Sequence, residues 1–374
     1  MRALSIPFAL SAALLAISGL SASAHERPEL ALEEARVDAM QIAATDFIAT
    51  LDERQRAQVV STIDDVNART KWSNLPISMA PRDGLAVADM TVAQRTAFHA
   101  MIAAALSSQG YLKTTTIMWH EDVLRSMVDS MLAEMEDDDP NKANAASFAE
   151  NYDAEKFFVR VFGDPADEEW GWLLTGHHFA ASITVSHGRI AFVPLFLGAS
   201  PQVVPEGRYA GWRILQHEAD RALALLGTLR PDQLELALVG AEVDESVFAG
   251  PGIQSNSRTH YGIAASGLDP FQMSLLDDLL DEYLGDASNE AAARQRAAIE
   301  ADGMDALRFA WWGPTDQPRG RYMFRVQGPS VLIDFIREKS PDGGFNHVHS
   351  IMRDPSNDYG AKWLQRHYQE SHPN

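Results

Sequence analysis

The chain has 374 residues, with 31 basic and 52 acidic side chains and a formal net charge of −21 at pH 7. So acidic a protein repels nucleic-acid phosphates and anionic membrane surfaces, and we expect neither as a partner. The sequence contains no cysteine, which excludes disulfides, thiolate metal sites and cysteine nucleophiles. Any metal ion must therefore be held by histidine, carboxylate or water.

The first residues have the pattern of a secretory signal peptide. Arg2 is followed by an apolar run from Ala3 to Leu20, and Ala22-Ser23-Ala24 supplies small residues for cleavage. We therefore predict a signal peptide over residues 1–24 and export of residues 25–374 to the periplasm or the extracellular space. No later apolar run is long enough for a bilayer, so no membrane insertion is expected.

Helical periodicity dominates from about residue 30 to residue 138. Four segments share a helix-start pattern, in which glutamine follows four residues after an apolar residue: LDERQ (51–55), MTVAQ (90–94), LRPDQ (229–233) and LDPFQ (268–272). A glutamine at this position can close a capping box. Because the four segments are irregularly spaced, we interpret them as a shared helix-start device and not as a solenoid.

The middle of the chain changes to strand-like sequence. Residues 171–198 are rich in β-branched and aromatic side chains, with a turn at Ser186–Arg189, and this predicts a β-hairpin. Helical segments follow, separated by a long Gly- and Ser-rich loop at 241–267, which we expect to be functional because long ordered loops are uncommon.

Four short strands and a final helix are predicted after residue 306: LRFAWWG, RYMFRVQG, SVLIDFIRE, FNHVHSIMRD and YGAKWLQRHYQESH. Strands joined by tight turns must be antiparallel. The predicted fold class is α+β, as a single large domain at 25–374. In it the central hairpin and the C-terminal meander form one antiparallel or mixed sheet, with helices packed on it.

The segment NHVHSIMRDPSNDYG (346–360) is dense in side chains that can act as ligands. His347 and His349 are two residues apart in a predicted strand, so both imidazoles share a face and can reach one ion. Asp354 and Asp358 follow in a predicted loop. The alternative is that both histidines are exposed on the sheet and that Asp354 caps a turn.

The segment GHHF (176–179) places His177 and His178 at the start of a predicted strand. Neighbouring strand residues face opposite sides, so only one of the two is expected to join a given site. His178 shares its parity with the more polar face and is the predicted ligand. His177 shares its parity with the apolar face and is expected to be packed, with its nitrogens hydrogen-bonded.

Glu218 lies one helical turn after Ile214 and Leu215, next to a predicted buried stripe. A buried glutamate needs a partner, which could be a metal ion or an arginine on the next turn. Arg325 and Arg353 lie in strands near the histidine pair, where each could pair with a carboxylate or bind an anionic substrate group.

Eight segments of the chain carry a family resemblance: WSNLP (72–76), RDGL (82–85), GHHF (176–179), VPLFLGASP (193–201), GWRILQHEAD (211–220), FAWWG (309–313), RVQGPSVLIDF (325–335) and NHVHSIMRDPSNDYG (346–360). Together they resemble domain-of-unknown-function family 3500 over about residues 30 to 372. The resemblance implies a single, often exported domain with GHH and NHVHS as its signature, and it implies no activity. The chain departs from the pattern at RGRYMFRV, which lacks a histidine, and at LIDFIREKSPDGG, which replaces a more acidic stretch.

These patterns predict three groups of site residues. The metal ligands are His178, His347 and His349. The catalytic residues are Glu218, Arg353 and Asp354. The substrate-binding residues are Arg325, His177 and Asp358.

The leading hypothesis is an exported metal-dependent enzyme of the hydrolase type that acts on a small molecule. A divalent zinc, iron, manganese or copper ion would be completed by Glu218 or Asp354 and would activate a bound water. The alternative is a non-catalytic periplasmic binding protein with a polar pocket for a small anionic ligand. Cleavage after Ala24 would leave His25 at the amino terminus as a further copper ligand. The sequence lacks G-x-S-x-G, H-E-x-x-H and P-loop motifs, which disfavours serine hydrolases, gluzincins and nucleotide folds.

Overall fold

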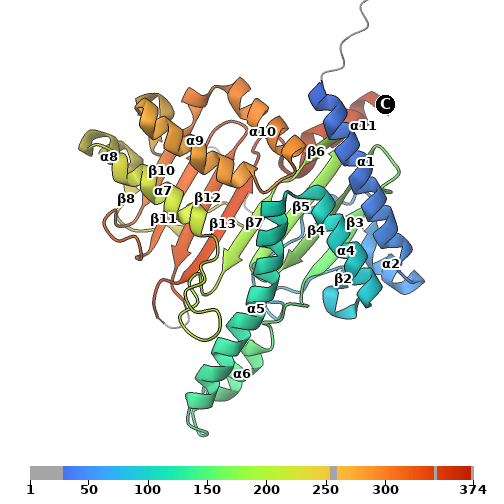
Figure 1. The fold of residues 1–374 in the computed structure, drawn as a ribbon, viewed down its shortest axis with the longest axis horizontal. Helices are drawn as coiled ribbons and strands as arrows, with labels where there is room; N and C mark the ends of the chain where they lie inside the picture. The colour runs from blue at the N-terminus through green and yellow to red at the C-terminus, as the bar shows by residue number, and fades with distance from the viewer. Residues whose placement is uncertain (1–27, 253–258, 341–342, 372–374) are drawn as a thin grey trace, which may run out of the picture.

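The computed structural model of the protein describes residues 28–252, 259–340 and 343–371. The predicted signal peptide at 1–24 and His25 lie outside the described residues. The described chain forms one mixed sheet with helices packed on it (Figure 1), which confirms the predicted α+β class and its single domain. No helix in the described part of the chain combines the length and apolar character needed to cross a membrane.

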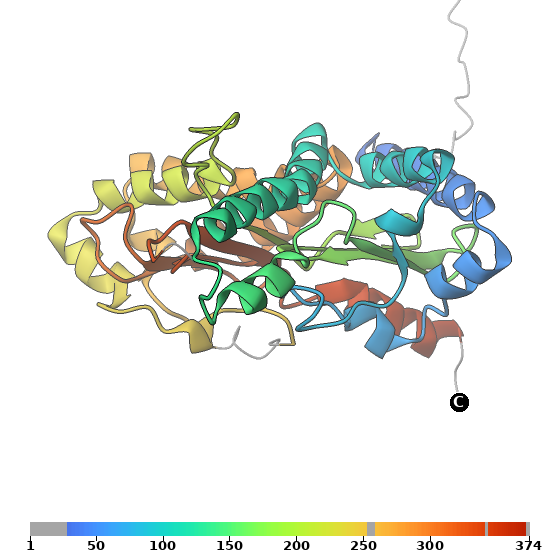
Figure 2. The same ribbon diagram turned by 90° about the horizontal axis from the view of Figure 1, so that it is seen from below.

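One face of the sheet carries most of the helices (Figure 2): α1 (Pro28–Ala49), α4 (Val92–Ala105), α5 (Ser108–Glu134), α7 (Gln216–Thr228), α9 (Pro270–Leu284) and α10 (Asn289–Asp302). The other face carries loops, α3 (Val66–Thr70) and the predicted C-terminal helix, α11 (Ala361–Ser371). The remaining helices are α2 (Glu53–Val59), α6 (Lys142–Ala149) and α8 (Pro231–Ala237). Because both faces are covered, β5 is buried along its whole length.

Ten of the strands follow one another across the sheet in this order: β1 (Val60–Ser61), β3 (Phe158–Phe162), β4 (Glu169–Gly176), β5 (Phe179–Ser186), β7 (Leu195–Ala199), β13 (His347–Arg353), β12 (Leu332–Glu338), β11 (Tyr322–Gln327), β10 (Arg308–Trp312) and β8 (Leu238–Gly240). Three short strands pair beside this path: β2 (Leu85–Ala86) with β3, β6 (Arg189–Ala191) with β5, and β9 (Ile263–Ala264) with β10. The four strands predicted near the C-terminus are β10 to β13. The predicted central hairpin is β5 and β6.

The sheet has two halves with the same plan. Each half starts with a short parallel edge strand, β1 or β8, and continues through three antiparallel strands to β7 or β13. At the centre β7 and β13 pair antiparallel, with Phe196 opposite Ile351 and Leu197 opposite Ser350. Followed inward from the two edges, the registers make Leu195, opposite Ala181, the counterpart of Met352, opposite Ile333. Leu195 and Met352 pair with each other, so a local twofold axis passes through this pair.

The same relation holds among the helices that begin each half. The side chains of Gln55 and Gln94 exchange hydrogen bonds of 3.4 and 2.7 Å, and those of Gln233 and Gln272 exchange two of 2.8 Å. Each pair is separated by 39 residues. The four helix starts are therefore two copies of one buried pair. The predicted helix-start device is confirmed by capping boxes with Gln55, Gln94 and Gln272, and the fold is one sheet and not a solenoid.

The buried glutamine pairs should contribute equally to the two halves. Gln94 donates to the carbonyl of Thr50, just after α1, and Gln272 to that of Thr228, the last residue of α7, at 2.9 and 2.8 Å. We expect Gln94→Ala and Gln272→Ala each to lower the free energy of unfolding by about 1–3 kcal/mol, since buried polar groups lose their partners. Denaturant unfolding measures both, with exposed Gln58→Ala as the control. If only one of the two variants lowers the free energy of unfolding, the two glutamine pairs are not equivalent.

Candidate metal centre

His177 and His178 form the two-residue turn between β4 and β5, because Gly176 and Phe179 are the last residue pair of that hairpin. His178 has a φ of 60°, in the left-handed region. The expectation that strand alternation separates the two rings is wrong, since turn residues do not follow strand parity. Their rings instead stack, with centroids 3.7 Å apart.

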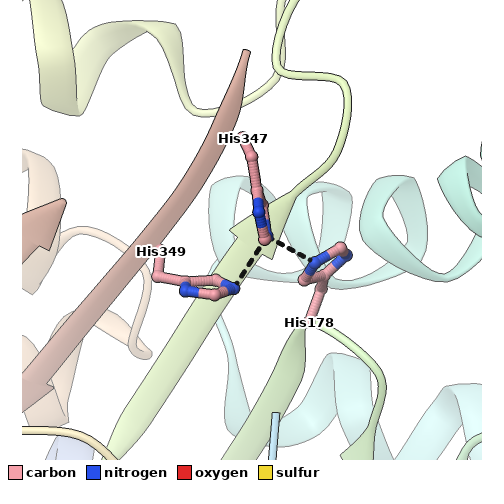
Figure 3. A group of neighbouring side chains, drawn as sticks. All are labelled: His178, His347 and His349. Carbon is pink, nitrogen blue, oxygen red and sulfur yellow. Dashed lines mark hydrogen bonds between the residues drawn. The ribbon is translucent and has the colours of Figure 1, made fainter. Parts of the chain in front are cut away.

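The two histidines of β13 lie on one face of the strand, as predicted. The Nε2 atoms of His347 and His349 are 3.0 Å apart, and the Nε2 of His178 lies 3.0 Å from that of His347 (Figure 3). The ligand atoms that the three residues offer all lie within 4.8 Å of one another. The expected meeting of the NHVHS and GHH segments in space is therefore confirmed.

Gly198 of β7 leaves room for this cluster. It pairs directly with His349, and a Cβ atom added at Gly198 would lie 2.9 Å from Cδ2 of His349 and 3.1 Å from Cδ2 of His178. A side chain there would push one of the two rings away. The sequence offers only a weak signal for this role, a glycine inside a strand.

Two carboxylates lie behind the rings. Glu338, opposite His347 in the ladder, has Oε2 at 3.3 Å from Nδ1 of His349 and at 3.8 Å from Nδ1 of His347. Glu121 of α5 has one oxygen 3.3 Å from Nδ1 of His178, in a close contact that is not aligned as a hydrogen bond. Carboxylates on the Nδ1 side favour a proton on Nδ1 and leave the Nε2 lone pairs free.

Burial keeps two of the imidazoles neutral. It lowers the pKa of His178 well below the ordinary value, and it lowers the pKa of His347 to about 2, with the neighbouring histidines adding to both effects. Burial opposes ionisation of Glu338, but the hydrogen bond from His349 and the nearby charges lower the pKa of this carboxyl overall. Neutral imidazole is the form that binds metal ions.

A second group of ligand atoms shares His178. Nδ1 of His177 lies 2.8 Å from the other oxygen of Glu121, and Glu121, His177 and His178 also meet within 4.8 Å. The His177 ring packs on Tyr152, with centroids 5.4 Å apart, and its side chain is 11% exposed. The predicted substrate-binding residue His177 thus lies at the rim of the cluster, tied to Glu121.

Glu218 does not lie with the histidines. Its carboxylate is buried and contacts Nζ of Lys113 at 2.7 Å, and Glu282 and Asp286 contact the same atom at 2.9 and 2.8 Å. Burial raises the pKa of Asp286 to about 6, although Lys113 opposes the shift. The expected metal or arginine partner of Glu218 is thus replaced by a lysine from α5.

Lys113 compensates three buried carboxylates, so its removal should be costly. We expect Lys113→Met to lower the free energy of unfolding at pH 7 by about 3–5 kcal/mol, the range for breaking a buried ion pair. Lys142→Met removes a lysine from a surface pair with Asp137 and should cost about 0–1 kcal/mol. Thermal and denaturant unfolding compare the two variants, and equal costs would contradict this role for Lys113.

The predicted arginines are also engaged elsewhere. Arg325 is buried against Asp334, with nitrogen–oxygen distances of 2.6 and 2.7 Å. Arg353 donates to the carbonyls of Ala249 and Gly250 at 2.8 and 2.9 Å and contacts Asp358 at 2.5 Å. These contacts anchor the described part of the long loop expected to be functional.

The two predicted aspartates shape the chain after β13. Asp354 accepts hydrogen bonds from the backbone and the hydroxyl of Ser356 at 2.8 and 2.7 Å, which is the turn-capping alternative. Asp358 pairs with Arg353 and accepts from the backbone of Asp354 at 3.3 Å. Among the described residues, neither Asp354 nor Glu218 joins a group of potential metal ligands. The acids beside the histidines are Glu121 and Glu338, which sequence reasoning missed.

The fold and this cluster define an α+β protein with a histidine-rich candidate metal centre on a pseudo-twofold sheet. The family model described as "Protein of unknown function (DUF3500)" matches residues 33–361, so the chain belongs to the DUF3500 family. No curated protein and no solved structure matches the chain.

The lowered pKa of His347 predicts a pH dependence for the metal-free protein. Between its ordinary pKa of 6.5 and its folded value of about 2, the unfolded chain binds the proton and the folded chain does not. Stability should therefore fall as the pH decreases below about 6.5. Thermal unfolding between pH 7.5 and 5 should show a shallower fall for His347→Asn than for wild type. Exposed His217→Asn is the control, and identical slopes in all three proteins would contradict the assignment.

Proposed function

We propose that the chain binds one divalent metal ion through His178, His347 and His349 and uses it in a hydrolase-type reaction on a small molecule. The observation that carries this proposal is the convergence of three Nε2 atoms, with two neighbouring separations of 3.0 Å. One ion with bonds of about 2.0–2.1 Å to imidazole can span such separations.

The neighbouring carboxylates favour a divalent cation over a shared proton in the space between the three Nε2 atoms. When each imidazole carries its proton on Nδ1, the lone pairs of the three Nε2 atoms point toward one another in a partly buried space. A single proton between two of these nitrogens would leave the third lone pair without a partner. A divalent ion satisfies all three. Its charge is matched by the two carboxylates, Glu121 and Glu338, that contact the same rings.

The open side of the cluster is where His347 lies. The His347 side chain is 20% exposed and that of Glu338 is 23% exposed, whereas the His178 side chain is 2% exposed. An ion held by three imidazoles keeps a position for water and lowers the pKa of that water. In this proposal Glu338, and not the predicted Glu218, is the carboxylate that can accept a proton from the bound water on the exposed side of the cluster.

Three imidazoles are compatible with zinc, iron, manganese or copper, so the metal is identified by experiment. The proposal includes export, which is supported by the charged, apolar and small-residue pattern of residues 1–24. The alternative anion-binding protein was expected to use Arg325 and Arg353. Both are occupied by carboxylates, so these two arginines do not support it.

Metal analysis of the protein purified without a histidine tag tests the centre. We expect one ion per chain, and metal binding abolished by His347→Ala or His349→Ala. Glu338→Gln should weaken binding by about 10- to 100-fold, because it removes the partner that orients two ligands. His217→Ala, on the exposed side of α7, should bind as wild type does. The centre is disproved if no ion is bound and zinc, manganese, iron and copper leave the unfolding temperature unchanged.

The hydrolase part of the proposal needs a separate readout. The metal-loaded protein should hydrolyse members of a panel of small esters, amides and phosphoesters, and Glu338→Gln should lose this activity at saturating metal. A protein that binds the ion but hydrolyses nothing in the panel would instead favour the binding-protein alternative.

A further inference from the structure

A cavity of about 510 Å³ lies between α7 and the strands β11 and β12, on the helix-covered face of the sheet. Tyr322 and Arg337 are directly opposite each other on the two strands, so both side chains line this cavity. Arg213, Asp220 and Arg319 also line it. Its size is within the range of small-molecule sites, about 300–1,000 Å³.

Arg337 is a buried cation with no carboxylate partner among the described residues. It is 8% exposed, its guanidinium donates to the amide oxygen of Gln202, and its Nε is buried with no hydrogen-bond partner in the described structure. The buried strand arginines Arg325 and Arg353, by contrast, each have a carboxylate oxygen within 2.7 Å. An uncompensated buried charge costs several kcal/mol, so this arrangement calls for an anion.

The other groups in the cavity do not supply that anion. Asp220 is held by both terminal nitrogens of Arg213, at 2.9 and 2.7 Å. Arg319 is exposed at the cavity wall and adds a third positive charge. Three arginines against one aspartate leave two net positive charges, in a chain whose net charge is −21.

The hydroxyl of Tyr322 is a second unused donor. The residue is fully buried, and its oxygen has no hydrogen-bond partner within the described parts of the chain. Because Tyr322 faces Arg337 across the strand pair, the hydroxyl and the guanidinium can donate to the same acceptor. Two buried donors beside one cavity indicate a ligand that brings oxygen acceptors.

We propose that this cavity binds a small organic oxyanion, with a carboxylate or phosphate group held by the guanidinium of Arg337 and the hydroxyl of Tyr322. Guanidinium binds both groups through paired, charge-assisted hydrogen bonds. The site is separate from the metal centre. Glu338, which contacts His349, is the next residue after Arg337, and successive strand residues point to opposite faces of the sheet.

Titration with succinate and with inorganic phosphate, each against chloride at equal ionic strength, tests the site by calorimetry and thermal unfolding. We expect at least one of the two anions to bind and to raise the unfolding temperature, and the larger response identifies carboxylate or phosphate as the recognised group. Arg337→Met should weaken binding by about 10- to 100-fold, as for the loss of hydrogen bonds to a charged group. Arg125→Gln, which removes an arginine from a surface pair on α5, should leave binding unchanged.

Two features of the variants separate binding from a structural role. Without anion, Arg337→Met should differ little in stability from wild type, since removal of the uncompensated charge offsets the lost hydrogen bond to Gln202. Tyr322→Phe should keep wild-type stability and still bind more weakly, since its hydroxyl has no partner to lose. The proposal is overturned if neither anion differs from chloride, or if both variants bind as wild type does.

A variant with His347→Ala and His349→Ala should keep the anion response. Loss of the response in this variant would show that the anion binds through the metal centre. That result would overturn the cavity proposal and leave the proposed metal site standing. If the wild-type protein binds no metal but keeps the anion response, the proposed metal site is overturned and the cavity proposal stands.

Discussion

The antiparallel pairing of β7 with β13 is the contact on which the candidate metal centre depends. It joins the two halves of the sheet and places β13 beside the strand that pairs with β5. The turn before β5 is thereby brought to the start of β13, so that His178 and His347, 169 residues apart in sequence, are in contact. Gly198 lies within the same pairing, and its missing side chain is what lets the rings approach.

The scaffold is symmetric, but the chemistry is not. In the first half the turn between the second and third main strands holds His177 and His178, and in the second half the matching turn, between β11 and β12, holds Pro329 and Ser330. The two halves thus have similar strands, but only the first half carries histidines at this turn.

Both proposed sites are exceptions to the same physical rule. Most buried charges of this protein are paired, as at Lys113 with its three carboxylates and at Arg325 with Asp334. The three Nε2 atoms and the guanidinium of Arg337 are different: within the described chain the Nε2 atoms have only one another, and the guanidinium has no carboxylate partner. Buried polar groups without partners are costly, so each exception indicates a ligand from outside the chain.

The sequence by itself determined the fold class, the strands from β10 to β13, and the two histidine segments. Local patterns carry this information, since alternation, turn residues and His-x-His spacing act within a few residues. It did not reveal the twofold relation of the halves, or Glu121, Glu338 and Gly198 beside the histidines. Those depend on contacts between residues far apart in the chain.

The misplaced residues show the same limit. Glu218, Arg325 and Arg353 were correctly identified as buried or half-buried charges in need of partners, but the partners are Lys113, Asp334 and Asp358. Arg337 gave no sequence signal, because what distinguishes it is that no carboxylate of the described chain pairs with it, the nearby Asp220 being held by Arg213. Local sequence determines which groups must be satisfied on burial, and only the tertiary structure decides which groups satisfy them, since those partners are set by the packing of distant segments.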